Sequence, residues 1–148
     1  RKYIEQMKKK AHSFHFGVIQ DQKLDVADEI MAPDGIVHGP LRSPDDPKRG
    51  PEVLKDIAKG DAKAFPDGLF FEHDEAVAEG NWVSIRWDAK GNNTGPLGPI
   101  PPANKELSFG GVDIYRFNDN GQIAEAWIYY DVLNILKQAG VEVKLPGS

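Results

Sequence analysis

The chain has 148 residues, of which 40% are hydrophobic and 28% are charged, and its formal net charge is -5 at pH 7. This length and composition suit one soluble domain with a sizeable core. The acidic balance argues against nucleic-acid binding, which needs a positive surface to contact phosphates. The absence of cysteine excludes disulfides, thiol catalysis and thiolate-bound metals. No apolar run approaches the ~18 residues of a transmembrane helix, and no signal peptide is visible, so we expect a cytoplasmic protein without a membrane partner.

The first 67 residues have helical periodicity. Apolar residues at three- and four-residue spacing predict an amphipathic helix at the start of the chain, formed by Ile4, Met7, Ala11, Phe14 and Val18. His12 and His15 lie in this helix, and we interpret them as surface or hydrogen-bonded core residues because no flanking acid completes a metal site. A second short helix is predicted over residues 24–31, with Asp25 as its N-cap. A third helix begins at Pro51, and its apolar stripe comprises Val53, Leu54, Ile57, Ala58 and Phe65.

A short strand is predicted between the second and third helices, over residues 35–40. It carries His38 and ends at Gly39-Pro40. A histidine beside a chain breaker can line a pocket or hydrogen-bond a turn carbonyl, and the sequence leaves both roles open for His38.

The second half of the chain changes to a period of two. Strands are predicted over residues 69–79, 81–90, 106–117 and 122–130, and a short helix over 131–139. The loop of residues 91–104 is rich in glycine and proline, and such a loop beside a sheet often rims a cavity. Helices followed by an antiparallel meander predict an α+β fold. We therefore expect a single domain over 1–148, helical over 1–67, with a meander over 69–131 that curves strongly around the helices and leaves a cone-shaped cavity.

Asp113 is the most informative residue of the meander, because it is an acid in the middle of a strand with the apolar Val112 and Ile114 beside it. Side chains alternate across a sheet, so Asp113 shares one face with Tyr115 and Phe117. If this face lines the cavity, the apolar surroundings raise the pKa of Asp113 and make it a candidate base. His38 or Asn93 could then polarise a carbonyl oxygen of the substrate.

A structural role for Asp113 is the alternative. Its carboxylate could accept hydrogen bonds from an indole or a guanidinium on the neighbouring strand, the candidates being Trp82, Trp87 and Arg86, or from a backbone amide.

Three other polar positions are interpreted as structural. Residues 72–75, with the sequence Glu-His-Asp-Glu, are expected to form a solvated strand face rather than a metal site. Asp131 lies where the last strand becomes a helix and is predicted to be an N-cap. Glu125 is expected to face outward or toward the dimer contact, where Arg86 or Arg116 could pair with it across strands.

Several segments together resemble the SnoaL-like polyketide cyclases of the nuclear-transport-factor-2-like superfamily. They are Ala78-Glu79-Gly80-Asn81-Trp82-Val83, Gly91-Asn92-Asn93-Thr94-Gly95, Ile100-Pro101-Pro102, Gly111-Val112-Asp113-Ile114-Tyr115-Arg116-Phe117, Gly121-Gln122-Ile123 and Tyr130-Asp131-Val132-Leu133. The resemblance implies an α+β cone or half-barrel with a deep apolar pocket. It also implies a homodimer formed through the sheet, and neither a metal nor an organic cofactor.

Characterised members of that family close a ring by aldol condensation, using an aspartate on the last strand helped by a histidine. Matching the last strand places the family's aspartate at Ile128 and a frequent histidine at Ala126. The histidine of the neighbouring strand corresponds to Asp113, and a histidine of the loop segment corresponds to Asn93. The resemblance therefore does not transfer the aldol machinery as it stands.

Two functional hypotheses follow from these observations. The first is a cofactor-free cyclase or isomerase that acts on a hydrophobic carbonyl compound, with Asp113 and His38 as its catalytic residues. The second is a binding module that holds a hydrophobic small molecule without converting it, which the apolar Ala126 and Ile128 favour. In either case the residues expected to contact the ligand are Trp82, Asn93, Ala126, Ile128 and Tyr130.

Overall fold

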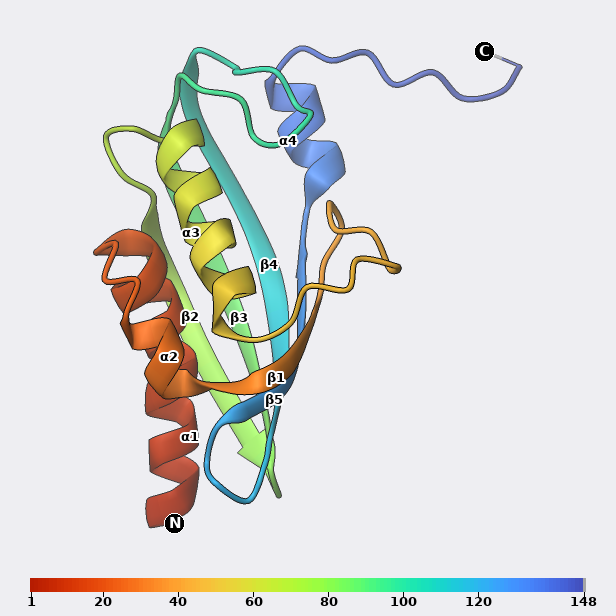
Figure 1. The fold of residues 1–148 in the computed structure, drawn as a ribbon. Coiled ribbons are helices and arrows are strands. Elements are labelled where there is room, and N and C mark those ends of the chain that lie inside the picture. Colours follow the sequence, from red (N-terminus) through yellow and green to blue (C-terminus); the bar gives the residue numbers. More distant parts are fainter. Residues whose placement is uncertain (148) are drawn as a thin grey trace.

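The computed structural model describes residues 1–147, apart from the side chain of His73 (Figure 1). The helical part comprises α1 (Lys2–Ser13), the π-helical segment η1 (Phe14–Gln20), α2 (Val26–Ile30) and α3 (Pro51–Ala64). The strands are β1 (Met31–His38), β2 (Phe70–Glu79), β3 (Trp82–Asn93), β4 (Lys105–Phe117) and β5 (Ile123–Tyr130), and α4 (Val132–Gln138) follows the last strand. The predicted order of helices and strands is confirmed.

The five strands form one sheet in the order β1-β5-β4-β3-β2. The predicted antiparallel meander is confirmed for β2 to β5. The sheet as a whole is mixed, because β1 pairs in parallel with β5, from Met31 opposite Ile123 to His38 opposite Trp127. The strand predicted over residues 35–40 therefore begins earlier, directly after α2, and covers the free edge of β5.

The helices cover one face of the curved sheet (Figure 1). The apolar stripe of α1 and η1 is buried against this face, which confirms the amphipathic helix: Met7, Ala11, Phe14 and Val18 are all almost inaccessible. The sheet contributes Val83, Ile85, Tyr115 and Phe117 to the same core. Asp113 shares a face with Tyr115 and Phe117, as the alternation predicts; the structure shows that this is the inner face and that Asp113 is wholly buried.

The end of the meander is fixed by a local hydrogen bond. The carboxylate of Asp131 accepts a hydrogen bond from the backbone N–H of Asn134 at 3.0 Å, so the predicted N-cap of α4 is confirmed. The segment after α4 runs away from the body of the molecule (Figure 1). No helix in the described chain is long and apolar enough to span a membrane.

Candidate functional site

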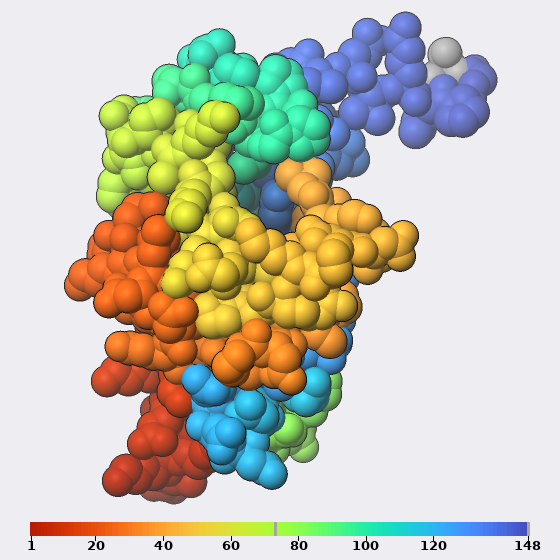
Figure 2. All heavy atoms as spheres, viewed as in Figure 1, coloured from red at the N-terminus to blue at the C-terminus, as the bar shows by residue number. Residues whose placement is uncertain are grey.

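A cavity of about 420 Å³ lies between the helices and the inner face of the sheet. Its wall is mainly apolar and aromatic and includes Phe14, Ile19, Val53, Leu69, Phe109 and Ile128. Figure 2 shows the surface hollowed between α3, the loop of residues 39–50 and the loop of residues 94–104. Leu97 and Gly98 line the cavity, so the glycine- and proline-rich loop rims it as the sequence predicts. The volume and the apolar wall are typical of a small-molecule site.

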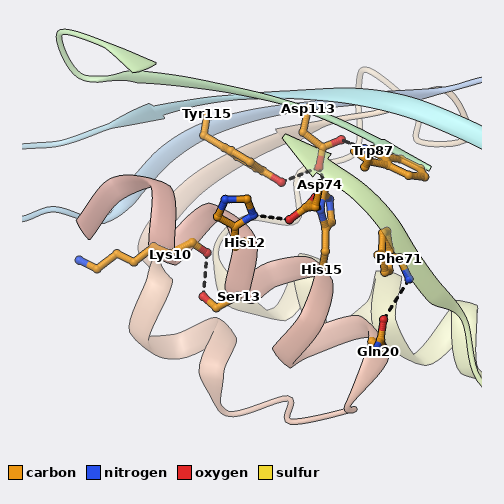
Figure 3. A network of polar contacts seen from close by, with 10 residues as sticks. All are labelled: Lys10, His12, Ser13, His15, Gln20, Phe71, Asp74, Trp87, Asp113 and Tyr115. Carbon is orange, nitrogen blue, oxygen red and sulfur yellow. Dashed lines mark hydrogen bonds and ion pairs between the residues drawn. The ribbon is translucent and has the colours of Figure 1, made fainter. Parts of the chain in front are cut away.

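Buried polar groups form a connected network behind one side of the cavity (Figure 3). His15, from the π-helical segment, is at its centre. The Nδ1 atom of His15 is 2.6 Å from an Asp74 oxygen, and its Nε2 atom is 2.7 Å from an Asp113 oxygen. His12, one helical turn earlier, hydrogen-bonds the other oxygen of Asp74. The imidazole of His15 also stacks on Phe71, with ring centroids 4.6 Å apart.

His15 is held in the charged state by its two carboxylate partners. Burial alone would lower the pKa of His15, but the hydrogen bonds to Asp113 and Asp74 outweigh burial and raise the pKa to about 9. Burial alone would raise the pKa of Asp74, but the hydrogen bonds from His15 and His12 lower it. At neutral pH His15, which lines the cavity, is therefore an imidazolium.

Asp113 is fully hydrogen-bonded within this network. One carboxylate oxygen accepts from the Tyr115 hydroxyl at 2.5 Å and from His15, and the other accepts from the Trp87 indole at 3.0 Å. This indole bond is one of those that the structural alternative for Asp113 predicts. His15 and Trp87 both line the cavity and Asp113 does not, so Asp113 acts on the cavity through its partners.

Asp61 is the acid that lines the cavity directly. Asp61 follows Val53 and Ile57 on α3 at a spacing of four residues, which places all three side chains on the same helix face. This face lines the cavity. No described side chain forms a hydrogen bond or an ion pair with the Asp61 carboxylate. The residue is partly exposed, and it lines the cavity. Burial raises the pKa of Asp61 to about 7, and the positive charge of His15 partly opposes this rise.

Tyr130 lines the cavity from the end of β5. Its ring contacts Trp87 and Phe109, with centroids 6.4 and 6.0 Å away. Within the described part of the chain, the hydroxyl of Tyr130 has no hydrogen-bond partner. Burial and the nearby Asp61 raise the pKa of Tyr130, so it is a neutral hydroxyl at physiological pH.

The structure brings three of the sequence-predicted site residues to the cavity: His38, Ile128 and Tyr130. The side chain of His38 is partly exposed, and its Nε2 atom is 2.7 Å from Glu125. Arg116 donates to the other oxygen of Glu125 at 3.2 Å, which confirms the predicted pairing across strands. The hydrogen bond from His38, followed by that from Arg116, lowers the pKa of Glu125. The ring of His38 stacks on Trp127 with centroids 5.3 Å apart, so it faces the outer side of the sheet although the residue belongs to the cavity lining.

Three other predicted ligand contacts do not reach the cavity. Trp82 lies on the outer face of the sheet, stacked on Trp127 with centroids 5.6 Å apart. Ala126 is buried in the core between sheet and helices and is absent from the cavity wall. Asn93 is buried, and its amide donates to the carbonyls of Ala64 and Gly95 while its oxygen accepts from the Ala103 N–H at 2.6 Å. The side chain of Asn93 thus holds the loop of residues 94–104 on the end of α3.

Sequence reasoning missed the role of Asp74, and the prediction of a solvated face for residues 72–75 is wrong at this position. The pairing of β2 with β3 shifts register between Glu72 and Glu75, and the extra residue turns Asp74 inward. Glu72 and Glu75 remain on the solvent side, paired with Lys90 and Arg86. The side chain of His73 lies outside the described residues. A strand bulge leaves no simple mark in the sequence, so Asp74 could not be placed from periodicity.

The signals for Asp61 and His15 were present in the sequence. Asp61 interrupts the apolar stripe of the third helix at the next four-residue step after Ile57, and His15 follows Ala11 at the same spacing. Each is a polar residue on a buried helix face. Among the residues whose side chains are described, no three His, Asp or Glu side chains are arranged to hold a metal ion.

Comparison with known proteins agrees with this architecture. A family model described as SnoaL-like polyketide cyclase matches residues 9–139. TsrD from Streptomyces laurentii is 22% identical with a TM-score of 0.76, and the match covers 96% of this chain and 98% of that one. IdmH from Streptomyces antibioticus is 24% identical with a TM-score of 0.71, over 90% and 99% of the two chains.

A third solved structure has the same fold. It is a protein from Jannaschia sp. CCS1 described as a candidate SnoaL-like polyketide cyclase, 20% identical with a TM-score of 0.77 over 94% of each chain. No curated protein matches the sequence. At these identities the solved structures support the fold, and the family model, which matches most of the chain, identifies the family. The chain belongs to the SnoaL-like polyketide cyclase family.

Proposed function

We propose that the protein is a cofactor-free enzyme that performs acid–base chemistry of the cyclase or isomerase type on a hydrophobic carbonyl compound. One observation carries this proposal. A mainly apolar cavity of about 420 Å³ contains a carboxylic acid, Asp61, that has no partner among the described side chains and whose pKa burial raises to about 7. An acid is costly to keep in such a place, and a pKa near neutrality suits proton transfer.

The buried network supports the same reading. The cavity wall holds a charged imidazole, His15, whose orientation is fixed at both ring nitrogens. A positive charge that is already fixed in place stabilises a negative charge that develops nearby in a reaction, because the imidazolium does not have to reorient during the reaction. Aldol closure, isomerisation and dehydration all begin by removing a proton beside a carbonyl, which creates such a charge.

Solvent exchange of the α-proton tests this proposal. The protein is incubated in D₂O with a panel of β-keto esters and polycyclic ketones, and loss of the α-proton signal is followed by NMR, with heat-unfolded protein as the control. We expect at least one compound to exchange faster with folded protein than with the control. Equal exchange across the whole panel would contradict the enzyme proposal.

The second candidate is a binding module for a hydrophobic small molecule. The observation that favours it is Ile128, which lines the cavity where the resemblance places the catalytic aspartate of the family. Saturable quenching of the fluorescence of Trp87 by the same compounds, together with no exchange, would support binding without turnover.

We also propose that two copies of the chain associate through the outer face of the sheet. Trp82, Val112 and Ile114 are large apolar residues on this face, and each is about two-fifths exposed. Contiguous exposed apolar side chains on a sheet are typical of an interaction surface.

A further inference from the structure

We propose that Asp61 removes the α-proton of the substrate and that Tyr130 donates a hydrogen bond to the carbonyl oxygen. This inference rests on the proposed function and assigns its two reacting groups, neither of which is the acid that the sequence singles out. Both residues line the same cavity, Asp61 from α3 and Tyr130 from β5 on the facing sheet.

The other acidic and basic groups of the inner wall are already engaged. Both nitrogens of His15 are bonded to carboxylates, so the ring has no lone pair with which to take a proton. Asp113 accepts three hydrogen bonds and is separated from the cavity by its own partners. A base must reach the proton it removes, and neither residue can do so without breaking the network.

Asp61 satisfies the geometric requirement because its carboxylate opens onto the cavity and has no partner among the described side chains. Tyr130 satisfies the complementary requirement, since its hydroxyl is a donor without an acceptor in the described part of the chain. Both groups line the one cavity, Asp61 from α3 and Tyr130 from β5. A bound ketone can therefore meet an acceptor for its α-proton and a donor for its oxygen at once.

The step balances without an added reagent. The Asp61 carboxylate forms an O–H bond with the α-proton, and the electron pair of the broken C–H bond becomes the C=C bond of an enolate. The carbonyl π pair moves to oxygen, where the Tyr130 hydroxyl stabilises the charge by hydrogen bonding. The enolate carbon then attacks a second carbonyl in a cyclase, or takes a proton at another position in an isomerase.

The charges around Asp61 determine its protonation. His15 faces it from η1 and Tyr130 from β5, while His38, Arg42, Asp46 and Asp56 also line the cavity from β1, the loop of residues 39–50 and α3. Burial raises the pKa of Asp61 to about 7, so a large fraction is ionised at physiological pH and remains basic enough to take a proton. Burial and the nearby Asp61 raise the pKa of Tyr130, so its hydroxyl keeps its proton and can donate a hydrogen bond.

Two conservative substitutions with matched controls test the assignment. Asp61→Asn and Tyr130→Phe remove the base and the hydroxyl at nearly constant volume. Asp67→Asn, at an exposed position after α3, and Tyr129→Phe, on the opposite face of β5, are the controls. Each variant is assayed for α-proton exchange in D₂O and for binding of an unreactive hydrocarbon analogue by fluorescence quenching, after its fold is checked by circular dichroism.

We expect Asp61→Asn to lower the exchange rate by about 100-fold or more, as loss of a general base does, while analogue binding is retained. We expect Tyr130→Phe to lower it by roughly 10- to 100-fold, as loss of one donor to an oxyanion does. The two controls should exchange at the wild-type rate. Should Asp61→Asn not fold, Asp61→Ser replaces it in the same comparison.

The proposed function and the assignment of Asp61 fail in different ways. Wild-type protein that exchanges no compound of the panel would overturn the proposed function. Wild-type protein that exchanges a compound which Asp61→Asn exchanges equally fast would overturn the assignment of Asp61 and leave the proposed function standing. A loss of exchange in Asp61→Asn accompanied by equal loss of analogue binding would also overturn the assignment, because Asp61 would then only hold the ligand.

Discussion

Asp61 is a carboxylic acid kept in an apolar wall at a cost in stability. Burial disfavours its ionised form and raises its pKa to about 7, although the imidazolium of His15 reduces the effect. An acid in an apolar wall with no partner among the described side chains is unusual, because buried polar groups in proteins are almost always hydrogen-bonded. This loss of folding stability is explained if Asp61 is required for a reaction rather than for folding.

The destabilisation caused by an ionised Asp61 predicts how the stability of Asp61→Asn, relative to wild type, changes with pH. Because the pKa is raised from its ordinary value of 3.8 to about 7 in the folded protein, the folded state binds the proton more tightly than the unfolded chain does. Wild-type stability therefore falls as pH rises from about 4 to about 7, and the neutral amide does not share this fall. We expect the variant to be more stable than wild type by about 1–3 kcal/mol at pH 8, after discounting for the part of the side chain that solvent reaches, and equally stable at pH 3.5.

Urea unfolding at the two pH values measures this difference, with Asp67→Asn as the control for loss of one negative charge. A gain of equal size at both pH values would mean that the amide stabilises by packing and that the folded state imposes no penalty on the charge. A variant less stable than wild type at pH 8 would contradict an Asp61 carboxylate that has no partner among the described side chains.

At the scale of elements, the cavity rim depends on how one loop is attached to one helix. The N–H of Gly95 donates to the carbonyl of Ala64 at 3.2 Å, and the amide of Asn93 donates to the same carbonyl. These bonds hold the loop of residues 94–104, and with it Leu97 and Gly98, over the end of α3. The rim is therefore built from backbone contacts, in which a side chain at residue 95 has no room.

Gly95→Ala should weaken this attachment. A Cβ atom at residue 95 would lie 2.0 Å from the backbone oxygen of Lys63, a distance that forces the backbone to move. We expect a loss of stability of about 1–3 kcal/mol, as for other overpacked sites. Gly60→Ala is the matched control, because its Cβ would meet nothing within 4 Å on exposed α3 and should stabilise the helix by up to about 1 kcal/mol. Thermal unfolding of both variants gives the comparison, and equal effects of the same sign would contradict it.

Regular elements are what the sequence predicts well. The stripe of α1, the face that Asp113 shares with Tyr115 and Phe117, and the N-cap at Asp131 follow from periods of 3.6 and 2 and from capping chemistry, and the structure confirms them. The meander is confirmed for the same reason, since it rests on strand alternation and turn residues. The family resemblance rests on particular sequence segments, and the family model confirms it.

Irregular elements are what the sequence does not predict. His15 belongs to a π-helical turn, which holds more residues than an α-helical turn, and Asp74 follows a bulge in β2. Each irregularity shifts the positions of the following side chains by about one residue. The hydrogen bond between His15 and Asp74 therefore cannot be predicted from the helical period of 3.6 or the strand period of 2. Asn93 differs from its prediction for another reason. An asparagine side chain can contact a ligand or anchor a loop, and the sequence does not distinguish these roles. In the structure its amide group bonds three backbone groups and anchors the loop.

At the scale of the whole molecule, one face of the sheet is covered by helices and the other presents apolar side chains. Ile114 lies opposite Trp127 on the neighbouring strand, and Trp82 stacks on Trp127. This surface lies on the side of the sheet opposite the cavity, so pairing of two copies would leave the cavity mouth accessible.

Pairing through this surface predicts a dimer that one charge disrupts. We expect wild-type protein to have twice the mass of the chain in light scattering coupled to size exclusion. Ile114→Asp should be a monomer with unchanged circular dichroism, because a buried unpaired charge at an interface costs several kcal/mol. Leu145→Asp, in the segment after α4, is the control and should remain dimeric. A wild-type monomer, or a dimer that survives Ile114→Asp, would contradict the proposed face.

The central claim is that an acid in the cavity transfers a proton, and the pH profile of α-proton exchange tests it most directly. Exchange of one responsive ketone by wild-type protein is measured by NMR from pH 5 to pH 9, beside Asp61→Asn. We expect a rate that rises with ionisation of Asp61, with a midpoint near its pKa of about 7, and a variant without this rise. A wild-type profile that the variant reproduces would show that the proton goes to another group, and the role given to Asp61 would be wrong.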